Sequence, residues 1–262
     1  MPFLEFPDRR IHYMLSGQST APVLMLSNSL GTNLSMWDAQ LAEFEKHFSL
    51  LRYDTRGHGR TTVVPGFYNF EQLGGDVVAL LDALKLERVH FCGLSMGGMT
   101  GLWLGLHAAS RLRKLIVCSA AAKFGNAELW EKRIATVRQG GMNSISTQVV
   151  ERWYTSEFRE RAPEAVRATL EMIESTAVEG YVSCCAALRD SDLREDVANI
   201  RAATLIISGS YDPAATPADG HSLSSSIQGA QYSELHAAHL SNIEAPQDFT
   251  REVMRFLTSE RA

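Results

Sequence analysis

The stretch Cys92-Gly93-Leu94-Ser95-Met96-Gly97-Gly98 carries the pattern Gly-x-Ser-x-Gly between two apolar segments. The run before it, residues 89–92, is typical of a buried strand, and the run after it, residues 99–107, is typical of a helix. A serine on such a strand-to-helix turn is a candidate nucleophile. The glycines on either side of Ser95 favour this interpretation, because a Cβ at either position would collide with neighbouring backbone.

The composition is that of an ordinary globular protein with 262 residues and a formal net charge of −5. Such a balance predicts no broad basic face for nucleic acid or anionic lipid. We find no apolar run of the roughly 20 residues that span a membrane and no secretory signal pattern at the N-terminus. The four cysteines lack zinc or disulfide spacing, which predicts buried free thiols. We therefore expect a cytoplasmic monomer or homodimer that binds neither nucleic acid nor membrane.

Strand and helix patterns alternate on both sides of the opening stretch. Strands are predicted over 3–6, 11–15, 22–27, 48–53, 89–92, 115–119, 203–209 and 231–236, and helices over 36–46, 70–86, 99–107 and 246–258. The first two strands read as a hairpin. The alternation from residue 22 to 119 favours a parallel sheet with right-handed crossovers. The sequence thus predicts an α/β fold whose mostly parallel, eight-stranded sheet is flanked by helices.

Residues 123–196 interrupt this alternation, because they contain helical patterns and no convincing strand. The predicted helices cover 127–139, 144–160, 163–175 and 178–188. Since the strand pattern resumes at residue 203, we interpret residues 123–196 as a helical cap inserted into a core. That core would comprise residues 1–122 and 197–262.

A serine nucleophile needs a base within hydrogen-bond reach, and the base needs an orienting acid. Among the eight histidines, His239 is the strongest candidate, because it lies in a loop after the last strand; His58 is the second. Asp212 follows the strand at 203–209. The carboxyl ends of parallel strands meet at one edge of a sheet. We therefore predict that Ser95, Asp212 and His239 form a catalytic triad.

Other titratable residues have plainer interpretations. Asp54 also follows a strand, but the nearby Arg52 and Arg56 predict an ion-paired structural role. Four further histidines lie within strand patterns or at helix ends, where a packed or solvated imidazole is expected. These are His12, His47, His90 and His107.

Acyl transfer from a serine also needs two backbone N–H groups aimed at the developing oxyanion. One is expected from Met96, which directly follows the nucleophile. The other is expected from the loop after the strand at 22–27, at Leu30, with Gly31 keeping the loop close to the substrate. The alternative is that residues 28–31 form an ordinary turn.

These motifs together resemble the α/β hydrolases over nearly the whole length, and more narrowly the bacterial 3-oxoadipate enol-lactonases of aromatic catabolism. The resemblance rests on residues 26–32, 36–38, 53–59 and 92–99 and on the segments around Asp212 and His239. Asn28-Ser29 stands where most α/β hydrolases have His-Gly, which is a mark of the enol-lactonase-like group. Arg60-Thr61 departs from relatives that often carry a small residue followed by serine.

The resemblance implies a small anionic enol lactone as substrate, 3-oxoadipate as product, and an acyl-enzyme formed on the serine of a Ser-His-Asp triad. It implies neither a metal nor an organic cofactor. Something must receive the substrate carboxylate, and the cap is the expected source. Candidate cap residues are Trp130, Arg133 and Trp153, of which the first two lie three apart on one helix face.

Several other functions remain open at this point. The same fold carries carboxylesterases, C–C bond hydrolases of aromatic catabolism and cofactor-free haloperoxidase-like esterases. A dehalogenase or epoxide hydrolase is disfavoured, because it would need a carboxylate at the position of Ser95. A non-catalytic binding protein on a hydrolase fold is disfavoured by the complete candidate triad.

Overall fold

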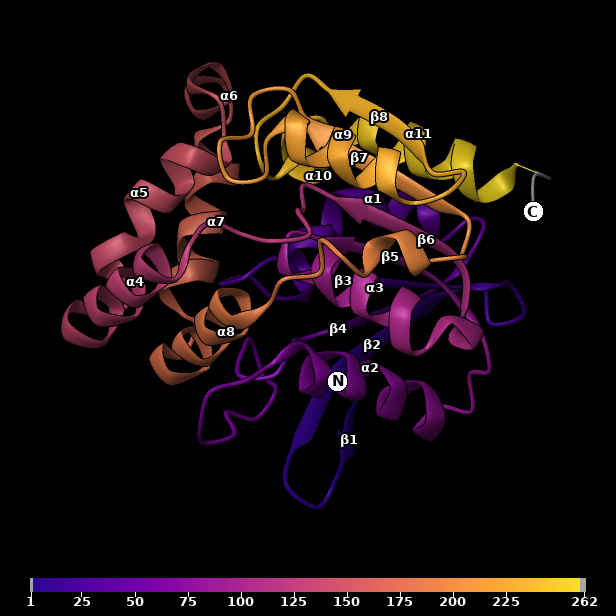
Figure 1. Ribbon diagram of the computed structural model, residues 1–262, viewed down its shortest axis with the longest axis horizontal. Helices are drawn as coiled ribbons and strands as arrows, with labels where there is room; N and C mark the ends of the chain where they lie inside the picture. The colour runs from indigo at the N-terminus through magenta and orange to yellow at the C-terminus, as the bar shows by residue number, and fades with distance from the viewer. Residues whose placement is uncertain (1, 260–262) are drawn as a thin grey trace.

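A single eight-stranded sheet organises the computed structural model, which describes residues 2–259 (Figure 1). Its strands are β1 (Phe3–Glu5), β2 (Arg10–Gly17), β3 (Val23–Ser27), β4 (Ser49–Tyr53), β5 (Val89–Leu94), β6 (Leu112–Cys118), β7 (Thr204–Gly209) and β8 (Gln231–Leu235). They lie in the order β1-β2-β4-β3-β5-β6-β7-β8. The pairs β1–β2 and β2–β4 are antiparallel, and all the others are parallel. The predicted fold class is confirmed.

Helices connect the parallel strands and cover the sheet. They are α1 (Asp38–Phe44), α2 (Phe70–Ala83), α3 (Met96–His107), α9 (Pro217–Ser226), α10 (Ser241–Glu244) and α11 (Pro246–Thr258), with short 3₁₀ turns at Leu34–Trp37, Ala109–Arg111 and Val197–Asn199. The central strands β4, β5 and β7 are buried along their whole length. Helix α3 packs on β5 and β6, so the residue that begins α3 is held rigidly at the sheet edge.

Two helices were not anticipated from the sequence. Helix α9 begins with a capping box in which Thr216 accepts from the backbone of Asp219 and the Asp219 carboxylate accepts from Thr216. A low hydrophobic periodicity hides α9, because only Gly220 and Leu223 of its ten residues are buried. The four-residue α10 is too short to give a periodic signal.

Five helices lie between β6 and β7: α4 (Ala127–Gly140), α5 (Asn143–Trp153), α6 (Ser156–Arg161), α7 (Pro163–Glu174) and α8 (Val178–Asp190). We call them the helical insertion; Figure 1 shows them together at the left, beside one edge of the sheet. The prediction of one helix over 144–160 is wrong. Tyr154 is extended and the side chain of Thr155 accepts from Phe158 N, so the chain turns and begins a new helix there.

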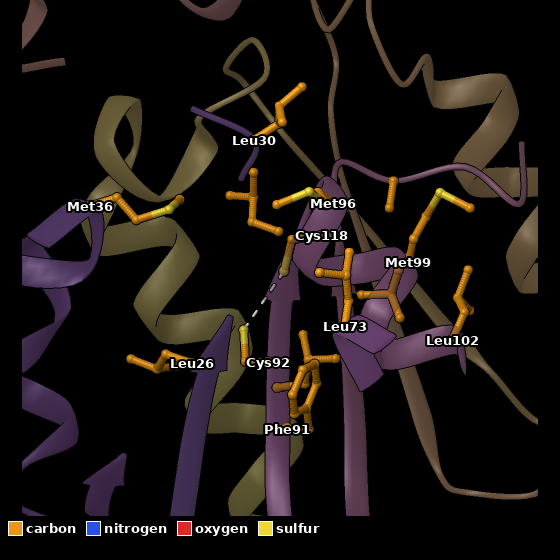
Figure 2. Close-up of a cluster of buried hydrophobic side chains, with 14 of the residues drawn as sticks. Leu26, Leu30, Met36, Leu73, Phe91, Cys92, Met96, Met99, Leu102 and Cys118 are labelled. Atoms are coloured by element: carbon orange, nitrogen blue, oxygen red, sulfur yellow. Dashed lines mark hydrogen bonds between the residues drawn. The ribbon is translucent and has the colours of Figure 1, made fainter. Parts of the chain in front are cut away.

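The four cysteines of the chain are free and buried, as predicted. Figure 2 shows Cys92 and Cys118 side by side on β5 and β6, with their Sγ atoms 3.9 Å apart. Burial raises the pKa of the Cys118 thiol well above its ordinary value, so the thiol stays neutral. No helix within residues 2–259 is long and apolar enough to cross a membrane.

Candidate active site

Ser95 lies at a sharp turn between β5 and α3, with φ 59° and ψ −115°. A Cβ on Gly93 would lie 2.1 Å from the carbonyl oxygen of Gly97, and a Cβ on Gly97 would lie 2.3 Å from the carbonyl oxygen of Ser27. The predicted need for glycine on both sides of the serine is therefore confirmed. The Ser95 N–H donates to the carbonyl of Cys118 at 2.8 Å, which fixes the strained turn against β6.

His239 and Asp212 form a buried pair at the carboxyl ends of β8 and β7. Nδ1 of His239 lies 2.7 Å from Oδ2 of Asp212, so its N–H donates to the carboxylate and leaves Nε2 as the basic nitrogen. The second oxygen, Oδ1, accepts from the backbone N–H groups of Ala214 and Ala215 at 2.7 and 3.1 Å. Both carboxylate oxygens are thus held, and the orientation of the imidazole is fixed.

The helical insertion supports the loop that carries His239. The indole of Trp153 stacks on the imidazole of His239 with ring centroids 5.7 Å apart, and the Trp153 carbonyl accepts from Leu240 N at 3.2 Å. The carboxylate of Glu244 accepts from Ala238 N at 2.8 Å with one oxygen and from Thr155 N at 3.2 Å with the other. Helices α5 and α6 therefore help to determine where the imidazole lies.

A cavity of about 220 Å³ lies between the sheet edge and the helical insertion. Six of the eight predicted site residues line it: Leu30, Ser95, Trp130, Arg133, Trp153 and His239. The other two lie behind the wall. Asp212 is screened by His239, and the side chain of Met96 is buried in the core, as Figure 2 shows. Only the backbone N–H of Met96 can serve the cavity.

The charge of the cavity wall is positive. Arg133 and Arg152 both line it, and no acidic side chain does so among the described residues. Nη1 of Arg133 lies 3.2 Å from the hydroxyl of Tyr181, and Nη2 of Arg152 lies 3.5 Å from the carbonyl of Pro213. These contacts leave most guanidinium donors of both arginines uncommitted. The wall can therefore receive a carboxylate.

Trp130 contributes its ring face but not its N–H group to the cavity. Nε1 of Trp130 donates to the carbonyl of Phe124 at 2.7 Å, and the residue is buried. The contact ties helix α4 to the segment that follows β6. Trp130 thus shapes an apolar wall in a fixed rotamer.

The loop after β3 brings Leu30 to the cavity, where Figure 2 shows it above the start of α3. Met96 is the first residue of α3, so its N–H has no acceptor within the helix and carries the positive end of the helix dipole. Asn28 fixes the loop. Its Nδ2 donates to the carbonyl of Tyr53 at 2.7 Å, and its Oδ1 accepts from Nε1 of Trp37 at 2.9 Å.

His58, the second candidate base, does not line the cavity. Its Nε2 accepts from the backbone N–H of Gly31 at 2.9 Å, and its Nδ1 lies 3.2 Å from the carbonyl of Arg56. Burial lowers the pKa of His58 to about 4, so the imidazole is neutral and can accept at Nε2. His58 therefore supports the loop at Leu30 instead of meeting Ser95.

Asp54 is a structural residue, but the arginine partners expected for it are wrong. Its Oδ2 lies 2.7 Å from Nδ1 of His12, and its Oδ1 accepts from Leu34 N at 2.9 Å. Arg52 instead pairs with Asp38, and Arg56 with Asp76, each at 2.6 Å. The two guanidinium groups are therefore paired with carboxylates from helices α1 and α2 instead of Asp54.

A model of the α/β-hydrolase fold matches residues 22–246 of the chain. The chain belongs to the α/β-hydrolase family. This hydrolase is 42% identical to 3-oxoadipate enol-lactonase 2 of Acinetobacter baylyi over 97% of both chains. It superposes on the enol-lactonase of Burkholderia xenovorans with a TM-score of 0.97 and 44% identity, covering 98% and 100% of the two chains.

A crystal structure of a hydrolase from Pseudomonas aeruginosa is also similar, with a TM-score of 0.96 and 43% identity over 98% of both chains. These similarities confirm the resemblance predicted from the motifs. They also establish that the protein is an enzyme that hydrolyses bonds of the ester or lactone type.

Two polar groups of the hydrolase's cavity were missed at the level of the sequence. Arg152 directly precedes the predicted site residue Trp153 in the sequence, and this neighbourhood could have indicated that Arg152 is also near the cavity. The Oγ atom of Ser29 is buried without a hydrogen-bond partner in the described part of the chain, and Ser29 lines the cavity beside Leu30. The sequence marks the Asn28-Ser29 pair as unusual, but it does not show that Ser29 lines the cavity. No group of three or more metal-ligating side chains occurs within residues 2–259.

Proposed function

We propose that this hydrolase opens the ring of 3-oxoadipate enol-lactone to give 3-oxoadipate in the β-ketoadipate pathway of aromatic catabolism, with Ser95, His239 and Asp212 as its catalytic triad. One observation carries the proposal: Ser95 and His239, which is paired with Asp212 behind it, line one small cavity that holds two arginines and no acidic side chain among the described residues. Relatives named 3-oxoadipate enol-lactonase, at 42% and 37% identity, support the choice of substrate.

Acylation begins when Nε2 of His239 takes the proton of the Ser95 hydroxyl, while Asp212 stabilises the imidazolium. The Ser95 oxygen attacks the lactone carbonyl and forms a tetrahedral oxyanion, which accepts from the N–H groups of Met96 and Leu30. The ring C–O bond then breaks, and His239 returns the proton to the enol oxygen. The enol leaves easily because it tautomerises to a ketone, and its carbon chain remains attached through the ester on Ser95.

Deacylation follows the same path in reverse order. His239 removes a proton from water, the hydroxide attacks the ester carbonyl, and the same two N–H groups hold the second oxyanion. The Ser95 oxygen leaves with the proton from His239. The free acid is 3-oxoadipate, and the enzyme returns to its starting state without a cofactor.

The helical insertion supplies binding rather than chemistry. In this scheme residues 123–196 form a cap over the core of residues 1–122 and 197–262. Arg133 or Arg152 pairs with the acetate arm of the substrate, and Trp130 and Trp153 enclose the ring. The cavity of about 220 Å³ lies below the range of about 300–1,000 Å³ that is typical of sites for drug-sized ligands, which favours a small substrate.

Kinetics with a serine variant test the proposal. Ser95→Ala is expected to lower kcat for the enol lactone by about 10³-fold or more, because the triad acts as a unit. Ser225→Ala, on the exposed face of α9, changes an equivalent hydroxyl far from the cavity and should keep wild-type activity. Near-wild-type lactonase activity in Ser95→Ala would refute the assignment.

Two further measurements separate this function from its alternatives. The ratio of kcat/KM for the enol lactone to that for p-nitrophenyl acetate should strongly favour the lactone; a ratio near one would indicate a general carboxylesterase. A fluorophosphonate should label Ser95 covalently in the wild type. Failure to label would indicate a non-catalytic binding protein on the same fold.

A further inference from the structure

A second cavity lies at the amino-terminal ends of the central strands, on the edge of the sheet opposite Ser95. It has a volume of about 430 Å³, and its wall includes His90 at the start of β5 and Lys114 in β6. Strand β5 runs straight from His90 toward Ser95, so five residues at about 3.3 Å each separate the two sites by about 16 Å. This cavity is therefore distinct from the candidate active site.

Four cationic side chains line this cavity: Arg88, Arg113, Lys114 and Arg201. No acidic side chain lines it, and none of the four forms an ion pair with a carboxylate within residues 2–259. The chain as a whole carries a formal net charge of −5, so this cluster of positive charge is opposite in sign to the net charge of the protein. Like charges held together repel, and a bound anion would relieve that repulsion.

The four cations differ in how many donors they retain. Nζ of Lys114 donates to the carbonyls of Phe256 and Ser259 at 2.9 and 2.8 Å. Lys114 therefore attracts an anion through its positive charge but does not donate a hydrogen bond to it. Arg88 and Arg201 each donate only to backbone carbonyls and keep part of the guanidinium uncommitted. Arg113 is exposed and makes no hydrogen bond to the described residues, so its whole guanidinium is available.

His90 adds a polar side chain to the wall of the same cavity. The residue is only 8% exposed, and its Nδ1 has no hydrogen-bond partner in the described part of the chain. Its ring packs edge-on against Phe48, which offers no acceptor. Burial, with the charges of Arg113 and Lys114, lowers the pKa of His90 to about 4. Because the protein closes Nδ1 off from the cavity, the neutral imidazole can donate an N–H to an anion there only from Nε2.

We propose that this cavity binds a small multivalent anion, with the guanidinium groups of Arg113 and Arg201 pairing with its oxygens and His90 donating to it from the cavity wall. Phosphate and dicarboxylate groups share the required chemistry, because both present several oxygens to a guanidinium fork. The site does not depend on the proposed lactonase reaction.

Calorimetric titration with inorganic phosphate, and separately with adipate, at constant ionic strength tests the proposal, with Arg133→Ala/Arg152→Ala as the background in every titration so that the active-site cavity lacks its two arginines. Arg113→Ala/Arg201→Ala should weaken binding of the preferred anion by about tenfold or more, since each charge-assisted hydrogen bond contributes substantially. Arg161→Ala/Arg167→Ala removes the same charge from exposed positions of the helical insertion and should leave the affinity unchanged. Phosphate and adipate distinguish the two possible sources of the anion.

Imidazole resonances followed by NMR during the titration locate the bound anion. His90 should shift with a midpoint equal to the calorimetric Kd, whereas the buried His58, which lies in the loop after β4, should not. Arg113→Ala alone serves as a second variant, because an exposed side chain without hydrogen bonds can be removed without affecting the fold. Equal affinity in both double variants, or binding that leaves His90 unshifted, would overturn the proposal.

Discussion

Nε2 of His58 accepts a hydrogen bond from the backbone N–H of Gly31 at 2.9 Å. The carbonyl of the same glycine accepts from the hydroxyl of Thr176 at 3.2 Å, in the turn between α7 and α8. Gly31 is therefore held from the core on one side and from the helical insertion on the other. Because Leu30 directly precedes it, these two bonds position the backbone N–H that we assign to the oxyanion.

We expect His58→Ala to lower kcat by about tenfold to a hundredfold, because a displaced oxyanion donor loses part of its transition-state stabilisation. The KM should change little, since Arg133 and Arg152, which we propose bind the substrate carboxylate, are untouched. His58→Gln is the matched control, because its amide oxygen can accept from Gly31 and should restore much of kcat. Steady-state kinetics on both variants provide the measurement. A His58→Ala enzyme with unchanged kcat would contradict the positioning role.

The low pKa of His58 also predicts how stability depends on pH. In the folded state burial lowers the pKa from 6.5 to about 4, so the unfolded chain takes up the proton first as the pH falls. The free energy of unfolding is therefore highest above pH 6.5 and decreases as the pH falls from 6.5 towards 4. The loss attributable to this residue is about 3 kcal/mol over that interval.

Urea unfolding at pH 7, 6 and 5 measures this dependence. His58→Gln should show a shallower decline than the wild type, because glutamine does not titrate. Some decline should remain, since burial lowers the pKa of His90 in the same direction. Parallel curves for the two proteins would show that His58 does not contribute.

Much of the fold could be predicted because strong local signals agree with one another. Each of the eight strands is a short apolar or alternating run, and the glycines around Ser95 fix the turn sterically. The missed features have weak or ambiguous signals. The break between α5 and α6 depends on Thr155 acting as a helix cap within an otherwise helical pattern, and α9 has almost no buried face.

The candidate site was predictable where topology alone decides it. Ser95, Asp212 and His239 each follow a strand, and parallel strands bring such residues to one edge. Partners set by side-chain packing were not predictable. The sequence could not indicate that His58 faces Gly31, or that Arg152 shares a cavity with Arg133, because those contacts join segments far apart in the chain.

Because Arg133 and Arg152 line the cavity, we expect the enzyme to depend on them for binding an anionic substrate. Arg133→Ala and Arg152→Ala should each raise KM for the anionic lactone, and the double variant should raise it by about tenfold or more, as expected for a lost charge-assisted contact. Neither change should affect KM for p-nitrophenyl acetate, which carries no carboxylate. Arg161→Ala, an exposed residue of α6, is the matched control. An equal loss with both substrates would indicate a general packing defect.

Glu244 links the His239 loop to the helical insertion, and its isosteric variant tests that link. Its two oxygens accept from Ala238 N and from Thr155 N, so Glu244→Gln places an NH₂ group against one of these donors. A buried donor left without an acceptor costs about 1–3 kcal/mol, and urea unfolding should show a loss of that size. The kcat should fall as well, because Ala238 directly precedes His239. Glu157→Gln, on the exposed face of α6, should change stability by less than about 0.5 kcal/mol. If Glu244→Gln were as stable as that control, the carboxylate would not be holding the loop.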